Sequence, residues 1–123
     1  MSKKRILIVD DEADLVKMIA LRLRQADFEV LVAYDGQEGL EKARKEVPDL
    51  ILLDLMLPKL DGYKVCRLLK FDQKYKDIPI VILTARGEKS DEELVLEAGA
   101  DAYITKPYQH EVMLAKINEF LKK

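Results

Sequence analysis

Short apolar runs alternate with longer amphipathic segments along the whole chain. The runs are rich in Ile, Val and Leu and comprise Ile6–Val9, Phe28–Ala33, Leu50–Leu53, Ile80–Leu83 and Ala102–Ile104. This pattern is typical of strands that are buried on both faces of a parallel sheet. Helical spacing of apolar residues follows in Ala13–Gln25 (Val16, Ile19, Ala20, Leu23) and near the end of the chain (Val112, Met113, Ile117, Phe120, Leu121). The pattern therefore predicts alternating strands and helices.

Residues that favour helix ends support this interpretation. Asp35 and Ser90 each precede a glutamate by three residues, the spacing of a capping box. Asp61-Gly62 can begin a third helix, and Gly99 is placed to end a fourth. The result is five β–α units with short connections, which predicts a three-layer, doubly wound α/β sandwich.

Composition fits one small domain over residues 1–123. The 21 Lys and Arg nearly balance the 23 Asp and Glu, so a net charge of −2 gives no general attraction to nucleic acid or anionic membrane. The single cysteine, Cys66, excludes an internal disulfide and suits a reducing cytosol. Ile6–Val9 is too short for a signal peptide or a membrane span. We therefore expect a cytoplasmic protein, with no membrane partner and no direct nucleic acid contact from this segment.

Polar residues stand where the predicted strands end. Asp10 and Asp11 follow the first strand, Asp54 ends the third, Thr84 ends the fourth and Lys106 follows the fifth. In open α/β sheets, ligands bind beyond the carboxyl ends of the strands, near the point where the strand order reverses. If the order is 2-1-3-4-5, the first and third strands are neighbours, and the three carboxylates converge in one pocket.

Three adjacent carboxylates raise one another's pKa or require a cation. Mg²⁺ fits, because it takes oxygen ligands and is often bound by one or two carboxylates plus a phosphate. With the charge of Lys106 and the hydroxyl of Thr84, the pocket is suited to a phosphoryl group on Asp54. Each residue alone has an ordinary explanation as a helix cap or a solvated turn, so the prediction depends on their shared edge. Glu12 is interpreted as a favourable charge in the first turn of a helix.

These residues resemble the receiver domain of two-component response regulators. The matching segments run through the chain in order: Ile6-Leu7-Ile8-Val9-Asp10-Asp11-Glu12, Asp54 with Pro58 and Asp61-Gly62, Leu83-Thr84-Ala85, and Gly99-Ala100-Asp101 leading into Lys106-Pro107-Tyr108. The resemblance covers essentially the whole chain and implies a flavodoxin-like (βα)5 fold, with a five-stranded parallel sheet of order 2-1-3-4-5.

The resemblance also implies roles for individual residues. Asp54 would be the phospho-acceptor, and Lys106 would pair with a phosphoryl oxygen. Asp11 would bind Mg²⁺, or Mn²⁺ in its place, directly. Asp10 would act largely through water, and the backbone carbonyl of Met56 would complete the protein ligands. Thr84 would move toward the phosphoryl group, Tyr103 would rotate inward with it, and the Lys106–Pro107 bond would be cis.

The implied function is a phospho-acceptor signalling domain that catalyses its own phosphoryl transfer and slow dephosphorylation, rather than an enzyme. A sensor histidine kinase would donate the group, with Ala13–Gln25 as the docking helix. Phosphorylation would switch the face formed by the fourth helix, fifth strand and fifth helix, roughly Glu88–Leu121. We expect this face to bind a downstream protein or a fused output domain, or to pair with itself in a phosphorylation-dependent homodimer.

The output remains open between two architectures. Thr84-Ala85-Arg86-Gly87 resembles receivers that precede winged-helix DNA-binding domains. Those receivers often carry an acidic pair where this chain has Asp101 followed by Ala102, and their last helix tends to hold arginines where this one has Lys116 and Asn118. These departures favour a stand-alone or protein-binding regulator.

Two other classes of protein use related features. A phosphatase of the haloacid dehalogenase type also has an Asp nucleophile after a strand, but needs a second Asp two residues later, where this chain has Met56. We therefore expect the aspartyl phosphate to persist, with Met56 and Arg86 slowing the attack of water. A flavodoxin-like electron carrier needs a phosphate-binding loop after the first strand, where Asp10-Asp11-Glu12 would repel the phosphate.

Overall fold

The computed structural model describes residues 3–84, 89–107 and 109–121, without the side chains of residues 89–92 and 94. The chain forms five strands, β1 (Arg5–Val9), β2 (Glu29–Ala33), β3 (Leu50–Asp54), β4 (Ile80–Thr84) and β5 (Ala102–Thr105). The helices are α1 (Ala13–Gln25), α2 (Gly36–Glu46), α3 (Gly62–Lys70), α4 (Lys89–Ala98) and α5 (His110–Leu121). Strands and helices alternate as predicted, and each strand differs from its prediction by one residue at one end only.

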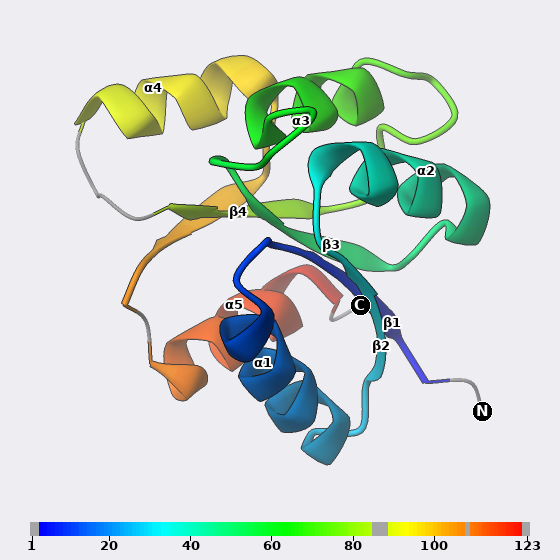
Figure 1. The fold of residues 1–123 in the computed structure, drawn as a ribbon, viewed down its shortest axis with the longest axis vertical. Helices are drawn as coiled ribbons and strands as arrows, with labels where there is room; N and C mark the ends of the chain where they lie inside the picture. Colours follow the sequence, from blue (N-terminus) through cyan, green and yellow to red (C-terminus); the bar gives the residue numbers. More distant parts are fainter. Residues whose placement is uncertain (1–2, 85–88, 108, 122–123) are drawn as a thin grey trace.

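The strands form one parallel sheet in the order β2-β1-β3-β4-β5. Helices α2, α3 and α4 cover one face of the sheet, and α1 and α5 cover the other (Figure 1). The three-layer (βα)5 sandwich of order 2-1-3-4-5 is thereby confirmed. Reversal of the strand order at β1 and β3 places the ends of these two strands side by side.

Two apolar cores lie on the two sides of the sheet. In β1, Leu7 and Val9 join the core under α2, α3 and α4, while Ile6 and Ile8 join the core under α1 and α5. This alternation follows from the two-residue period of a strand. It explains why the central strands read as continuous apolar runs, since both of their faces are buried. The predicted apolar face of α1 is confirmed, because Val16, Ile19, Ala20 and Leu23 are buried.

The predicted helix ends are mostly confirmed. Asp35 caps α2 by accepting a hydrogen bond from the Glu38 N–H at 2.8 Å, and Asp61 caps α3 through Lys64 N–H at 2.9 Å. Gly99 ends α4 at φ +82°, a left-handed conformation that costs glycine little. The capping box predicted at Ser90 depends on a side chain outside the described residues, and Ser90 lies within α4 rather than before it, because the helix begins at Lys89.

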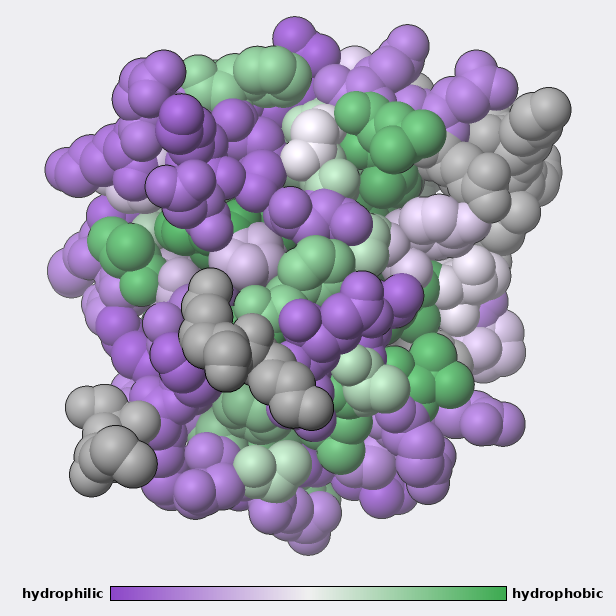
Figure 2. All heavy atoms as spheres, turned by 180° about the vertical axis from the view of Figure 1, so that it is seen from behind, coloured by the Kyte–Doolittle hydropathy of each residue, from purple (hydrophilic) through white to green (hydrophobic). Residues whose placement is uncertain are grey.

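The predicted apolar stripe of α5 is wrong at one position. Met113 and Ile117 are buried, whereas Val112 is 49% exposed. Val112 lies beside the row formed by residues 113, 117 and 120–121, so it is turned away from the sheet. The molecular surface seen from behind is mixed, with hydrophobic patches separated by hydrophilic groups (Figure 2). In the described part of the chain, no helix is both long enough and apolar enough to span a membrane.

Candidate functional site

Three carboxylates meet where β1 and β3 end. These strands pair directly, with Val9 opposite Leu53, so Asp10 and Asp54 follow neighbouring positions. Carboxylate oxygens of Asp10, Asp11 and Asp54 all lie within 4.8 Å of one another. Asp10 and Asp54 are buried, and Asp11 is exposed at the mouth of the site. The convergence that the sequence predicted is therefore present in the structure.

Lys106 brings a positive charge to the same place. Its ammonium nitrogen lies 3.0 Å from Asp10 Oδ2, 3.2 Å from Glu12 Oε1 and 3.8 Å from Asp54 Oδ2. The backbone N–H of Lys106 donates to the Thr84 carbonyl at 2.6 Å, which fixes the chain just after β5. The Lys106–Pro107 peptide bond is cis, as expected. One lysine is thus shared by three acidic side chains.

Burial and charge shift the pKa values in this cluster. Burial, reinforced by the charge of Asp10, raises the pKa of Asp54 to about 6, although Lys106 and the Met56 N–H act in the opposite direction. Burial alone would lower the pKa of Lys106. The hydrogen bond to Asp10 and the charges of Asp54 and Asp10 together outweigh burial, so the Lys106 pKa is raised. Lys106 consequently stays charged at physiological pH, and the pKa of Asp54, at about 6, lies well above the 3.8 of an ordinary Asp.

The loop after β3 is packed tightly against the acceptor residue. The Met56 N–H points toward Asp54 Oδ1 at 3.4 Å, and the Gly62 N–H donates to the Leu55 carbonyl at 2.9 Å. A Cβ atom on Gly62 would lie 2.0 Å from the Asp54 carbonyl oxygen, so only glycine fits there. The Met56 side chain is 79% exposed. Its backbone carbonyl as a metal ligand stays a prediction.

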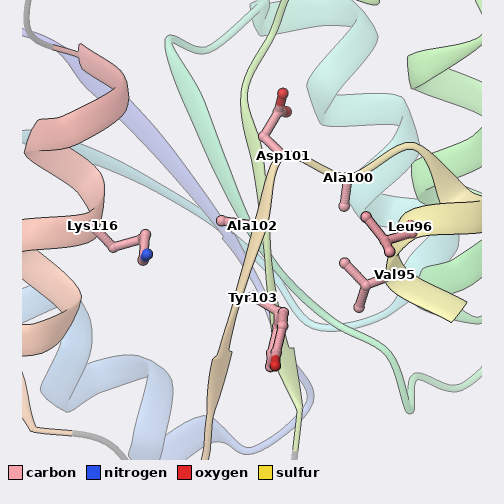
Figure 3. Close-up of a pocket in the computed structure, with 7 residues that line it drawn as sticks. All are labelled: Val95, Leu96, Ala100, Asp101, Ala102, Tyr103 and Lys116. Atoms are coloured by element: carbon pink, nitrogen blue, oxygen red, sulfur yellow. The ribbon is translucent and has the colours of Figure 1, made fainter. Parts of the chain in front are cut away.

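The two residues expected to switch lie on the strands beyond the acceptor. Thr84 is buried at the end of β4, next to β3, and Tyr103 is half-buried on the edge strand β5. Tyr103 borders a pocket of about 410 Å³ between α4 and α5. Figure 3 shows Val95 and Leu96 of α4 on one side of β5 and Lys116 of α5 on the other. The movements expected of Thr84 and Tyr103 stay predictions. Arg86 lies outside the described residues.

The contact of Glu12 with Lys106 in the site was not predicted from the sequence. Glu12 stands at the N-cap of α1, but its side chain makes no capping hydrogen bond and instead accepts from Lys106. The signal available was the third acid in Asp10-Asp11-Glu12, which helix-dipole reasoning explained equally well. Only the position of Lys106 beside it distinguishes the two explanations.

The donor set of the acidic cluster fits a small, hard cation. All three groups are carboxylates, and a magnesium ion with bonds of about 2.1 Å places its ligand oxygens roughly 3–4 Å apart. The observed limit of 4.8 Å requires only a small inward movement. Two buried acids against one lysine also leave negative charge that a cation would neutralise.

Comparison with known proteins gives a consistent result. A family model described as the response regulator receiver domain matches residues 6–118. The alkaline phosphatase synthesis transcriptional regulatory protein PhoP of Bacillus subtilis is 45% identical over 120 residues, which cover 98% of this chain and 49% of that protein. The DNA-binding dual master transcriptional regulator RpaA of Synechocystis is 43% identical over 119 residues, covering 97% and 49%.

Solved structures agree with these sequence matches. A putative response regulator from Chloroflexus aurantiacus superposes with a TM-score of 0.94 at 34% identity, over 99% of this chain and 100% of that one. The chain spans about half the length of the two curated relatives.

Proposed function

Because this chain belongs to the response regulator receiver domain family, we propose that it takes a phosphoryl group from a sensor histidine kinase onto Asp54. The observation that carries this proposal is the meeting of Asp10, Asp11, Asp54 and Lys106 at one edge of the sheet. Three separate segments supply charged groups to one small pocket there. Such an arrangement suits the binding and transfer of a phosphoryl group.

In the proposed reaction, a carboxylate oxygen of Asp54 attacks the phosphorus of a phosphohistidine. The new O–P bond forms as the P–N bond breaks, and the electron pair returns to the imidazole nitrogen, which then takes up a proton from water. Asp54 must be ionised to attack, and a pKa of about 6 leaves it mostly ionised at neutral pH. Lys106 lies close enough to pair with a phosphoryl oxygen. Mg²⁺, or Mn²⁺ in its place, held by Asp10, Asp11, Asp54 and the Met56 carbonyl, would neutralise charge on the transferred group.

The lifetime of the phosphoryl group depends on how water reaches Asp54. Met56 stands at the position where a haloacid dehalogenase phosphatase needs a general acid and base, and its thioether moves no proton. We propose that Met56 and Arg86 slow the attack of water on the acyl phosphate. Replacing Met56 with glutamine tests this point, and an unchanged lifetime of the phosphoryl group would refute it.

The face for the kinase is proposed to centre on α1. Met18 and Leu21 on this helix are 53% and 56% exposed, and their spacing of three residues places them side by side on one helix face. A groove of about 170 Å³ runs beside Met18 and is lined by Met18, Ile19 and Arg22 of α1 and by His110 and Met113 of α5. An apolar groove at this place suits an apolar helix of the kinase.

The output face is proposed to consist of α4, β5 and α5. The pocket that Tyr103 borders in Figure 3 lies on this face, between α4 and α5. Leu96 and Val112 expose apolar surface on this face, at 74% and 49%. Movement of Thr84 toward a phosphoryl group on Asp54 would pull on this region through β4 and β5. The face would then bind a downstream protein or output domain, or a second copy of the chain.

The curated relatives bear on the choice of output. PhoP and RpaA are named as transcriptional regulators and are about twice the length of this chain. This favours a fused DNA-binding output domain over the stand-alone regulator that the residues near Asp101 and Lys116 suggested. Gel-shift assays with the full-length gene product, with and without phosphorylation, would decide between the two.

Intact-mass spectrometry tests the central proposal. The wild type and Asp54→Asn are incubated with acetyl phosphate, with Mg²⁺ or with EDTA, beside a known receiver as positive control. We expect one phosphoryl adduct in the wild type that needs Mg²⁺ and is absent from Asp54→Asn. Asp77→Asn removes an exposed acid and should be labelled like the wild type. An unlabelled wild type beside a labelled control would disprove the function.

A further inference from the structure

The Lys106 ammonium donates hydrogen bonds to both Asp10 and Glu12. The nitrogen lies within hydrogen-bond distance of both, at 3.0 Å from Asp10 Oδ2 and 3.2 Å from Glu12 Oε1. An ammonium has three N–H groups, so these contacts occupy two of them. Asp54 Oδ2, at 3.8 Å, is an ion-pair partner beyond hydrogen-bond distance. Before phosphorylation, Lys106 is therefore bonded to the acids beside the acceptor rather than to the acceptor itself.

The two partners of Lys106 differ in what their loss would cost. Asp10 is fully buried, and its Oδ1 also accepts the Glu12 N–H at 3.0 Å, so its carboxylate depends on the protein for hydrogen bonds. The Glu12 side chain is 62% exposed, so water can replace Lys106 at little cost. The contact between Glu12 and Lys106 is consequently the one that can be exchanged.

We propose that Glu12 is a positioning residue that holds Lys106 in the unphosphorylated protein and gives it up when Asp54 carries a phosphoryl group. The proposal rests on Asp54 being the phospho-acceptor. A phosphoryl group brings additional negative charge and three strong acceptor oxygens next to Lys106. These oxygens compete with Glu12 for one N–H of the ammonium. Glu12 therefore opposes the phosphorylated state, and its removal should favour that state.

Beryllofluoride, a mimic of the phosphoryl group on aspartate, measures this competition without turnover. At saturating Mg²⁺, the apparent dissociation constant is determined by NMR for the wild type, Glu12→Gln and Asp14→Asn. Asp14 is the matched control, because it is an exposed acid in the first turn of the same helix and makes no described contact with Lys106. We expect Glu12→Gln to bind beryllofluoride about twofold to fivefold more tightly, and Asp14→Asn to change much less.

A second readout needs neither metal nor ligand. The ¹⁵N resonance of the Lys106 ammonium is recorded in EDTA for the same three proteins. It should move in Glu12→Gln and stay in place in Asp14→Asn, because Glu12 accepts a hydrogen bond from this group and Asp14 has no described contact with it. An unmoved resonance in Glu12→Gln would overturn the proposal.

The remaining outcomes separate this proposal from the function on which it rests. Equal tightening in Glu12→Gln and Asp14→Asn would mean that only general charge acts, and weaker binding in Glu12→Gln would mean that Glu12 supports the phosphorylated state. Either result overturns the role of Glu12 and leaves Asp54 as acceptor. A wild type that binds no beryllofluoride and gains no phosphoryl group would remove both proposals.

Discussion

Lys70 and Asp101 form an ion pair of 2.9 Å that joins the end of α3 to the start of β5. The same Asp101 oxygen accepts the Ile80 N–H at 2.8 Å, and the Lys70 ammonium also donates to the Ile78 carbonyl at 3.0 Å. The Lys70 side chain is only 11% exposed. Asp101 thus satisfies a buried cation and a strand N–H at once, within the chain.

Replacing Asp101 with alanine should destabilise the fold by about 1–3 kcal/mol, because Lys70 and the Ile80 N–H both lose an acceptor. Urea unfolding followed by circular dichroism measures the change. The matched control is Glu119→Gln, which breaks an exposed helix pair with Lys116 at 3.9 Å. It should cost less than about 0.5 kcal/mol. Equal losses in the two variants would show that Asp101 is an ordinary surface charge.

The buried charge of Asp54 should make the metal-free fold less stable as pH rises. Its pKa is about 6 in the folded state against 3.8 for an ordinary Asp, so the folded state binds the proton more tightly. Stability then falls between pH 3.8 and about 6 and stays lower above that range. Asp54→Asn removes the charge and should stabilise the metal-free protein at neutral pH by about 2 kcal/mol, or roughly 5–10 °C in Tm.

Calorimetry in EDTA at several pH values tests this expectation. The gain from Asp54→Asn should shrink as pH falls below about 6 and approach zero only below pH 3.8, where the wild-type carboxyl is protonated in both the folded and the unfolded state. Adding Mg²⁺ should stabilise the wild type more than Asp54→Asn, since a cation bound only by the folded state raises its stability. The exposed control Asp77→Asn should match the wild type throughout. A gain from Asp54→Asn that did not depend on pH would contradict the assigned cause.

Gly62→Ala should distort the backbone that positions Asp54. The added methyl would lie 2.0 Å from the Asp54 carbonyl oxygen and 2.8 Å from the Leu55 Cα atom, both backbone atoms that cannot move alone. We expect a loss of roughly 1–3 kcal/mol in stability. Labelling by acetyl phosphate should also be slower, because the Asp54 backbone is displaced. Lys64→Ala, at an exposed position of the same helix, should leave both measurements near wild type.

Cys66 should be unreactive in the native protein. Its side chain is fully buried and donates to the Ala98 carbonyl at 3.4 Å, and burial raises the pKa of its thiol to about 12. Ellman's reagent should therefore react only after unfolding in urea. Gln73→Cys in a Cys66→Ser background places a thiol at an exposed position and should react at once. Rapid native reaction of the wild type would show that α3 and α4 separate readily.

Much of the fold could be predicted because its signals are local. A strand buried on both faces must be apolar throughout, and the caps at Asp35, Asp61 and Gly99 act within one helical turn. The location of the site could be predicted from the same apolar runs, because its charged residues come directly after the strands. The position of Lys106 near Asp10 additionally required the strand order, which came from the family resemblance.

What could not be predicted depends on side chains that meet across the chain. Glu12 contacts Lys106, and Asp101 contacts Lys70, only because separate units are packed side by side. A pattern along one segment shows that an acid is present but not which base it faces. The exposure of Val112 is a smaller case, since a residue at the rim of an apolar stripe can lie on either side of the boundary.

The pairing of Asp10 with Lys106 closes a span of 96 residues. During synthesis, both acids of the β1 end and Asp54 leave the ribosome long before the lysine that balances them. No partial chain ending before β5 can assemble the complete pocket. If Asp54 is the phospho-acceptor, as proposed, then phosphoryl labelling would report the folding of the chain through β5 as well as the chemistry of the site.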